Sequence, residues 1–473
     1  MKTKSMIFGV AAIASSMLMA ADTPEVESVV MSQAQFGRMV TVTYKLKNAP
    51  AVVTFDVETN TLADASGEWV SIGGEAVCNA KGAVWRKVTE ADADSEGKYT
   101  ITWRPDLSWE GHKVSLADGG ARAVVTAWAL DNTPDYMVVD ISAGAQPNTQ
   151  KYYTSTNFLP GGLFGNPDYR MTKLVMRKIL AKDVEWTMGS TAQETLRSDN
   201  EATHTVKLNS NYYIGVFEIT QSQWGEIQSE RRTPSYFLKP EDCAMRPVER
   251  VCYNEIRTAS GDSKVADASY NWPNNPNPGS FLGILRSKTG IKFDLPSEAQ
   301  WEFAARAGNG STKWGDGSAI LNNGTDSNLG EIGRYKSNGG DGTGFGGTPD
   351  TTIYDASKGT ALVGSYLSND WGLYDMFGNI AEWCLDYYQD DIATAKDAAG
   401  VLYGGRENIN PEKPDECLSG NPACDSNGVP MRTVRGGGFG TWAHNCRPAY
   451  RNSKAQDLRY DIGFRVACAV EMD

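Results

Sequence analysis

Hydrophobic and polar residues alternate along four segments in the first third of the chain, which are Met39–Leu46, Ala51–Thr59, Lys98–Pro105 and Ala121–Leu130. Each segment has the length of a strand, and alternation with a period of two is typical of strands with one buried face. Turn-forming Gly, Pro, Asn and Asp residues lie between the segments. Several short strands at this spacing predict an Ig-like β-sandwich over residues 22–143.

The later part of the chain shows helical periodicity at two places, Thr220–Ser229 and Ser297–Ala307. Ser297 is a favourable N-cap, and Gln300 three residues later completes a capping box. Long Gly- and Asn-rich loops fill much of the rest, and in a compact domain such loops need something to hold them. We therefore expect an α+β protein: the sandwich, a linker over residues 144–170, and a domain with little regular secondary structure over residues 171–470.

The length of the chain indicates its number of domains, and its charge limits the classes of partner that it can bind. A chain of 473 residues is expected to fold as two domains. The formal net charge of −13 disfavours nucleic acid as a partner, because phosphate binding needs clustered Lys and Arg.

The first residues are typical of a secretory signal. Lys2 and Lys4 precede the apolar stretch Met6–Met19, and small residues follow at Ala20 and Ala21. We expect residues 1–21 to be a signal peptide and the protein to be periplasmic, cell-surface or extracellular. No later stretch is long enough for a membrane span. In such an oxidising place, Cys417 and Cys424 are candidates for a disulfide, although the other pairings stay open.

The segment Trp371–Trp383 combines acidic residues with large apolar ones. Asp375 and Glu382 bracket Gly378, and a tight turn there would let both carboxylates converge on a hard cation such as Ca²⁺. A second group is Asn328, Asn338 and Asp341. The alternative is that these side chains cap turns and helix ends. A zinc site is disfavoured because the three His residues are far apart.

The last candidate segment is Arg435–Arg465, in which arginines are interleaved with aromatic residues after a glycine triplet. Aromatic rings beside Arg form recognition surfaces for protein, peptide or glycan. The candidate ligand-binding residues are Trp442, His444, Arg447 and Tyr460. The alternative is that Arg451 and Arg465 are buried arginines paired with carboxylates.

These segments, in this order, resemble the formylglycine-generating enzyme (sulfatase-modifying factor) family. The matching pieces cover nearly all of the second domain and are WTMGS (Trp186–Ser190), FEIT (Phe217–Thr220), RPVERV (Arg246–Val251), DLPSEAQWEFAARAG (Asp294–Gly308), GLYDMFGNIAEW (Gly372–Trp383), RGGGF (Arg435–Phe439) and IGFR (Ile462–Arg465). The resemblance implies a fold similar to an elaborated C-type lectin core, with structural Ca²⁺.

The resemblance also implies calcium ligands. At one site Asp375 and Glu382 match side-chain ligands, and Gly378 and Ile380 match backbone carbonyls. At the other site the matching residues are Asn328 and Asp341 for side chains, with Leu329 and Thr343 for carbonyls.

The oxidase activity of the family uses two cysteines after the RGG motif, which bind Cu(I) as thiolates. Counted back from Arg451, the second falls at about Ala443 and the first near Phe439 or Gly440, and none of these residues is Cys. Cys446 lies past both positions and is a weak catalytic candidate, so copper is not expected.

The sequence therefore supports three hypotheses for the function. The leading hypothesis is an exported, calcium-stabilised member of this family that is non-catalytic and serves binding or assembly. The second is a formylglycine-generating oxidase that acts on a Cys in target sulfatases, using Cys446 with a distant thiol. The third is a ligand-binding module like the lectin-type proteins that share the fold.

Overall fold

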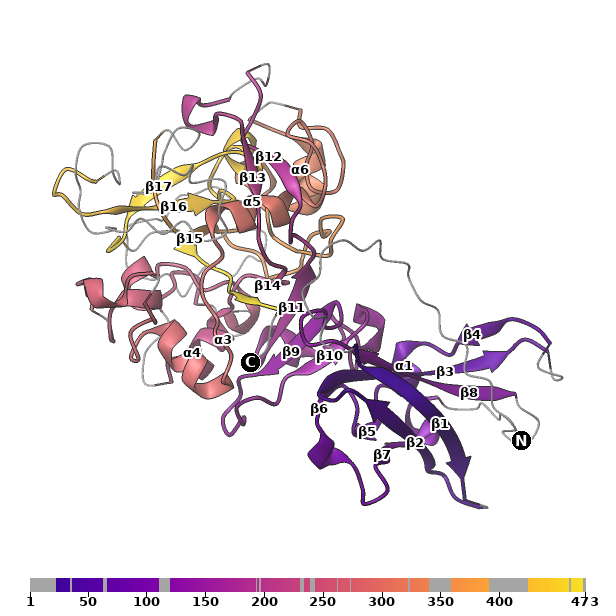
Figure 1. Cartoon of the computed structure of the whole chain (residues 1–473). Helices are drawn as coiled ribbons and strands as arrows, with labels where there is room; N and C mark the ends of the chain where they lie inside the picture. The colour runs from indigo at the N-terminus through magenta and orange to yellow at the C-terminus, as the bar shows by residue number, and fades with distance from the viewer. Residues whose placement is uncertain are drawn as a thin grey trace. The chain divides into compact units, whose positions relative to one another are not determined.

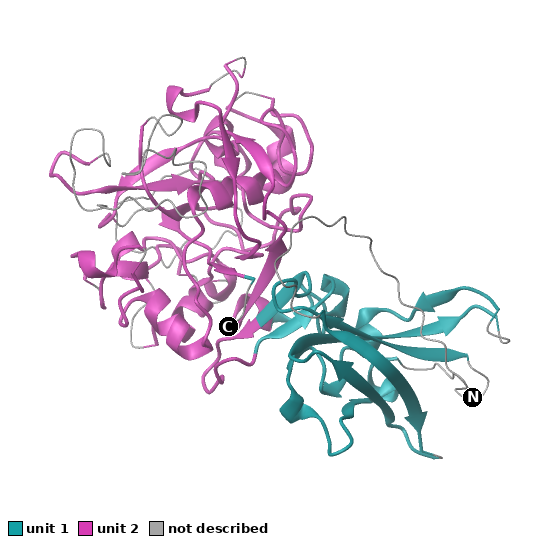
Figure 2. Ribbon diagram, in the orientation of Figure 1, with its two compact units in different colours: residues 1–138, 150–167, 470–473 teal, residues 139–149, 168–469 magenta. Residues whose placement is uncertain are grey.

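The computed structural model describes residues 23–470 except 35, 63–65, 110–119, 193, 195–196, 230–233, 239–242, 262, 273, 322–323, 340–358, 391–423 and 459–460. The chain forms two compact units, which Figure 2 colours separately. Unit 1 comprises residues 1–138, 150–167 and 470–473, and unit 2 comprises residues 139–149 and 168–469. Residues 150–167, expected to be part of a linker, thus belong to unit 1.

Unit 1 is built from two antiparallel sheets. One has the order β1-β2-β7-β5, with β1 Glu25–Gln33, β2 Val40–Lys47, β7 Tyr99–Trp103 and β5 Lys81–Gly82. The other has the order β4-β3-β6, with β8 also pairing with β3, and its strands are β4 Trp69–Ser71, β3 Ala51–Asn60, β6 Arg86–Val88 and β8 Ala121–Trp128. The four predicted strands are confirmed as β2, β3, β7 and β8.

The core of unit 1 follows from the alternation in its strands. On β2 the side chains of Val42 and Tyr44 are buried, and their neighbours along the strand are more exposed. Phe55 of β3 meets Trp103 of β7 with ring centroids 6.2 Å apart, so the two sheets share apolar contacts. Short helices α1 Gly74–Val77 and α2 Pro105–Ser108, and the antiparallel pair of β10 Lys151–Tyr153 with β9 Tyr136–Asp140, complete the regular structure.

Unit 2 has short elements and long irregular connections (Figure 1). Strands β11 Lys173–Ile179, β14 Tyr212–Gly215 and β19 Ala467–Ala469 form antiparallel neighbours. A four-stranded sheet has the order β17-β16-β15-β18, and its strands are β17 Asn452–Ala455, β16 Met431–Arg435, β15 Ala381–Tyr387 and β18 Ile462–Gly463. Strands β12 Glu185–Met188 and β13 His204–Lys207 form a separate pair.

The main helices of unit 2 are α3 Gln221–Ile227, α4 Phe281–Thr289, α5 Glu298–Arg306 and α6 Ser327–Ile332. The two predicted helices are confirmed as α3 and α5. At α5 the Ser297 hydroxyl accepts from the Gln300 amide at 3.1 Å, and the Gln300 side chain accepts from the Ser297 amide at 2.9 Å. Helix α4 was not predicted, although Ser280 caps its start and Gly290 ends it in the left-handed conformation.

The core of unit 2 is rich in tryptophan and also in buried charge. Trp301, Trp314 and Trp383 are completely buried. Because so little of this unit is regular, side-chain hydrogen bonds must fix its loops. Among the described residues, no helix has the length and apolar character needed to cross a membrane.

Candidate functional site

A network of buried ion pairs connects α5 to the glycine-rich segment that follows β16. Glu298 accepts from Arg435 Nη1 at 3.0 Å and from Arg451 Nε at 2.6 Å. Glu302 pairs with Arg435 and with Arg306. Burial disfavours the Glu302 carboxylate, but Arg306 and Arg435 outweigh it and lower its pKa to about 2. Every charge here has a partner, so the pairs fix the position of residues 435–451.

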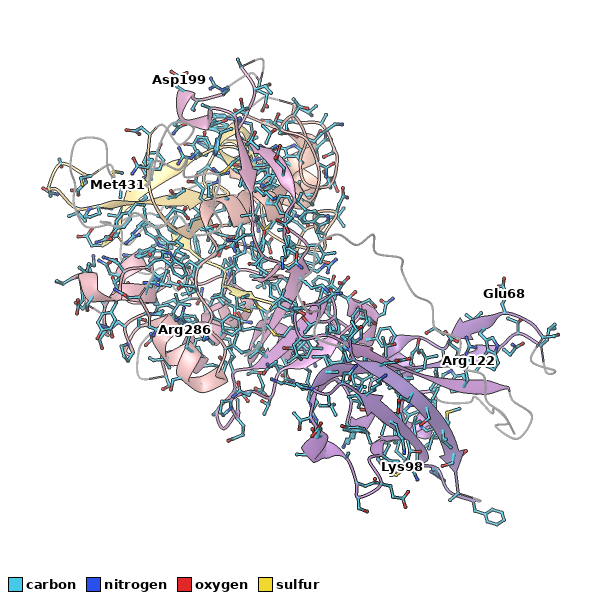
Figure 3. All side chains as sticks on the ribbon, in the orientation of Figure 1. Glu68, Lys98, Arg122, Asp199, Arg286 and Met431 are labelled. Carbon is cyan, nitrogen blue, oxygen red and sulfur yellow. The ribbon has the colours of Figure 1, made fainter. Side chains whose placement is uncertain are left out.

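Unit 2 contains further ion pairs, which involve Arg257, Arg286 and Arg465. Asp294 accepts from Arg257 at 3.0 Å and from Arg286 at 2.9 Å, and Figure 3 labels Arg286 on α4. Glu382 accepts from Arg465 Nε at 2.7 Å and Nη2 at 2.6 Å. Arg451 and Arg465 are therefore buried structural arginines, as the alternative reading of the sequence expected.

Glu382 belongs to the first predicted calcium set, and its carboxylate is already engaged. Besides Arg465, the Trp301 indole donates to it at 2.8 Å. Asp375 lies nearby in a backbone conformation with φ of 57°. Its Oδ2 accepts from the Gly364 amide at 2.7 Å, but its buried Oδ1 has no hydrogen-bond partner among the residues that the structure describes. Burial raises the pKa of Asp375 to about 6.

Glu218 is a third buried carboxylate at this place, and the sequence reasoning did not select it. It accepts from the Asn379 side chain at 2.6 Å and from the Ile380 amide at 3.2 Å. Burial raises its pKa, and the negative charges of Asp375 and Glu382 add to that effect. Arg465 thus interacts electrostatically with all three carboxylates. The FEIT motif contains Glu218, so this motif was the sequence signal from which the residue could have been selected.

These residues fit a cation at the first predicted site. The excess of carboxylates and the unpartnered Asp375 Oδ1 both favour an added positive charge. No group of three His, Cys, Asp or Glu side chains with metal-site geometry occurs within the described part of the chain. A Ca²⁺ ion would therefore depend on the backbone carbonyls of Gly378 and Ile380 beside Asp375 and Glu382, since Ca²⁺ accepts such mixed oxygen ligands.

The second predicted calcium set is only partly described. Asn328 and Leu329 lie in α6, where both amides donate to Asp326 Oδ1, at 2.9 and 3.1 Å. The capping side chain there is Asp326, and the Asn328 side-chain amide donates to the Ala319 carbonyl at 2.8 Å. Asn338 does take the alternative role of capping a turn, because its Oδ1 accepts from the Tyr335 amide at 2.7 Å. Asp341 and Thr343 lie outside the described residues, so this set stays a prediction.

Cys446 lies beneath the glycine triplet. Gly437 has φ of 68°, and a Cβ there would lie 2.8 Å from Cys446 Sγ. The Thr441 hydroxyl lies 3.4 Å from the same sulfur. Cys446 is completely buried, and burial raises the pKa of its thiol to about 12.

The Thr441 hydroxyl is thus a polar neighbour of the Cys446 sulfur, and Ala443 lies in the same hydrophobic core. Counting along the sequence did not find Thr441, because the turn that brings it back onto Cys446 is a tertiary feature. Cu(I) needs soft thiolate ligands, and a hydroxyl with a protonated thiol does not supply them. The residues present here do not fit copper.

The predicted ligand-binding residues divide between surface and core. Trp442 is 44% exposed, and Lys336 Nζ lies 4.1 Å from its ring centroid. His444 is partly exposed, and burial together with the Arg447 charge lowers its pKa. Arg447 is buried and donates to Glu201 at 2.7 and 2.9 Å. Tyr460 lies outside the described residues.

The buried carboxylate–arginine framework and the glycine triplet define a domain of the sulfatase-modifying factor class. Residues 164–470 match the family model described as sulfatase-modifying factor enzyme 1-like domain, and the chain belongs to this family.

Curated relatives carry different descriptions. The chain is 29% identical over 190 residues to chaperone protein LppX of Paenibacillus barcinonensis, covering 38% of this chain and 63% of that protein. It is 30% identical over 186 residues to the formylglycine-generating enzyme of Streptomyces coelicolor, covering 38% of this chain and 47% of that enzyme. The match to the mouse formylglycine-generating enzyme is 23% identical and covers 68% of this chain and 82% of that enzyme. The chain spans less than two thirds of the length of the two bacterial relatives.

Solved structures match the chain weakly. Treponema denticola variable protein 1 has a TM-score of 0.41 and 23% identity, and the match covers 63% of this chain and 96% of that one. PvdO from Pseudomonas aeruginosa has a TM-score of 0.38 and 22% identity, covering 63% and 94%.

Proposed function

We propose that the protein is a non-catalytic member of the sulfatase-modifying factor family that serves binding or assembly. The main support for this proposal comes from the side chains around Cys446. Its sulfur is buried, and it faces the Thr441 hydroxyl at 3.4 Å where a second thiol would be needed.

The chemistry of the thiol supports the proposal. The thiolate is the form that attacks substrates and binds soft metals. With a pKa of about 12, the Cys446 thiol is almost entirely protonated at neutral pH. The oxidase reaction of the relatives therefore has neither of its sulfur ligands in a usable form here.

The test compares the wild-type protein with Thr441→Cys. Each is incubated with Cu(I) and a Cys-x-Pro-x-Arg peptide, and aldehyde is sought by mass spectrometry while Cu(I) binding is followed by competition with a chromophoric chelator. We expect no aldehyde from the wild-type protein and tighter Cu(I) binding in Thr441→Cys, because the substitution places a second sulfur beside Cys446. Thr433→Cys, also in unit 2 but with its hydroxyl toward Glu298, is the matched control.

A second candidate function is the oxidase itself. The observation in its favour is that Cys384 lies in the same hydrophobic core as Cys446 and could supply another sulfur. Aldehyde formation by the wild-type protein, lost in Cys446→Ala and in Cys384→Ala, would replace the leading proposal with this one.

Four accompanying features are proposed on separate grounds. Export rests on the signal-like residues 1–21. Structural Ca²⁺ rests on the excess of buried carboxylates around Asp375. An Ig-like character of unit 1 and a lectin-type ligand-binding role of unit 2 rest on the two antiparallel sheets and on the exposed Trp442.

A further inference from the structure

Three chain segments converge around the indole of Trp442. A Cβ on Gly324 would lie 2.9 Å from the indole Cε3, so the ring rests directly on the Gly324 backbone. The Lys336 ammonium lies 4.1 Å from the ring centroid. The Lys336 amide donates to the Thr441 carbonyl at 3.0 Å, which fixes the lysine beside the tryptophan. We call Gly324, Thr325, Lys336, Ser337 and Trp442 the Trp442 platform.

The polar groups of the platform are exposed. Lys336, Ser337 and Thr325 are all exposed to solvent. Within the described part of the chain, Lys336 forms no ion pair with an acid, although the chain carries a net charge of −13. The Ser337 hydroxyl donates to the Gly324 carbonyl at 3.2 Å and lies 3.3 Å from the Thr325 hydroxyl. An apolar ring, a cation without an acidic partner and two hydroxyls thus lie within one small surface.

We propose that the Trp442 platform binds a carboxylate-bearing sugar, such as a uronic acid unit of an acidic glycan. The apolar face of the pyranose ring packs on the exposed part of the indole, as sugar C–H groups do on aromatic rings. The sugar carboxylate pairs with Lys336, and the sugar hydroxyls exchange hydrogen bonds with Ser337 and Thr325. This inference rests on the proposed binding function and names its ligand class.

A glycan fits this surface better than a peptide does. Peptides are commonly bound by an open strand edge or by an apolar groove. At the platform the flanking segments Lys336–Asn338 and Ala443–Cys446 are single helical turns, and no strand of the described chain passes through it. A flat ring with separate polar groups around it matches a sugar ring instead.

The cation of the platform is Lys336 and not His444. Burial and the neighbouring Arg447 lower the pKa of His444, so that side chain is neutral at physiological pH.

The test uses calorimetric titration of the whole protein with an oligogalacturonic acid trimer and with its methyl ester, which has the same rings without the charge. Lys336→Met is expected to weaken binding of the acid about three- to tenfold and to leave binding of the ester unchanged. Lys336→Arg retains acid binding, and Trp442→Ala weakens both ligands. Lys313→Met, an exposed lysine elsewhere in unit 2, is the matched control. Thermal unfolding of each variant shows that it is folded.

Several outcomes overturn the inference. Equal affinity for acid and ester, no effect of Lys336→Met, or binding only of a control peptide of glutamates would each exclude a carboxylate-bearing sugar. If the acid and the ester bind equally and both still need Trp442, the carboxylate-bearing sugar is excluded but the proposed binding function is not. The proposed function fails in a separate experiment, in which the wild-type protein would produce aldehyde.

Discussion

The Arg447 guanidinium donates to both oxygens of Glu201, and neither side chain reaches solvent. Its Nε also donates to the His444 carbonyl at 2.9 Å. This side chain is therefore a link between the segment after the glycine triplet and the turn before β13. From the sequence, Arg447 was indistinguishable from a surface arginine, because interleaved Arg and aromatic residues occur in both settings.

Arg447→Ala is expected to lower the free energy of unfolding by about 3–5 kcal/mol, since it leaves Glu201 buried without a cation. The measurement is urea denaturation. The double variant Arg447→Met/Glu201→Gln should recover part of the loss because Glu201 no longer carries a charge, although Glu194, 4.0 Å from Arg447, loses its cation. A single variant as stable as the wild-type protein would contradict the ion-pair interpretation.

At the scale of elements, α5 supplies the two carboxylates that pair with the buried arginines Arg306, Arg435 and Arg451. It carries Glu298, Glu302 and Arg306 on one nine-residue helix. Its boundaries could be predicted because they depend on local signals, the Ser297 cap and Gly308 after its end. What its acidic residues bind could not be predicted, since Arg435 and Arg451 approach from far along the sequence.

Ser297→Ala is expected to cost about 1 kcal/mol of stability, because it removes the acceptor of the Gln300 amide. The check is chemical denaturation followed by circular dichroism. Ser287→Ala, at an exposed position inside α4, should change stability much less. Similar effects from both substitutions would mean that the cap does not stabilise α5.

For the whole molecule, buried carboxyl groups predict how stability varies with pH. Burial raises the pKa of Asp386 to about 7, with a further contribution from the negative charge of Glu298. Burial also raises the pKa of Glu249 to about 8. A carboxyl with a raised folded-state pKa stabilises the protein below its unfolded pKa of about 4, and this contribution is lost as pH rises through the folded value.

The protein should therefore become less stable between about pH 4 and pH 8, where these two acids are ionised in the unfolded state but still hold their protons in the folded state. Asp386→Asn imitates the protonated acid and can still accept from the Glu298 amide, a bond of 2.6 Å in the wild-type protein. The variant should match the wild-type melting temperature below about pH 4 and exceed it by a growing margin up to about pH 7. An unchanged slope in Asp386→Asn would show that this residue does not control the effect.

Calcium should act on the whole of unit 2, because the site at Asp375 joins segments distant in sequence. A ligand that binds the folded state raises its melting temperature. We expect Ca²⁺ to raise the melting temperature relative to a chelator, and Asp375→Asn to remove that difference. Asp370→Asn, an exposed acid nearby in sequence, should keep it. Identical melting curves in Ca²⁺ and chelator would remove the structural-cation proposal.

The sequence by itself determined the local structure and the family of this protein. Alternation fixed the strands of unit 1, capping residues fixed α3 and α5, and ordered motifs identified the domain, because these signals act between residues near in sequence. Only the tertiary structure decided which side chains are buried and what they face. In that structure Arg447 pairs with Glu201, Glu218 lies beside Asp375, and the Thr441 hydroxyl contacts the Cys446 sulfur. Those contacts depend on chain segments that fold back on one another, and no local pattern encodes them.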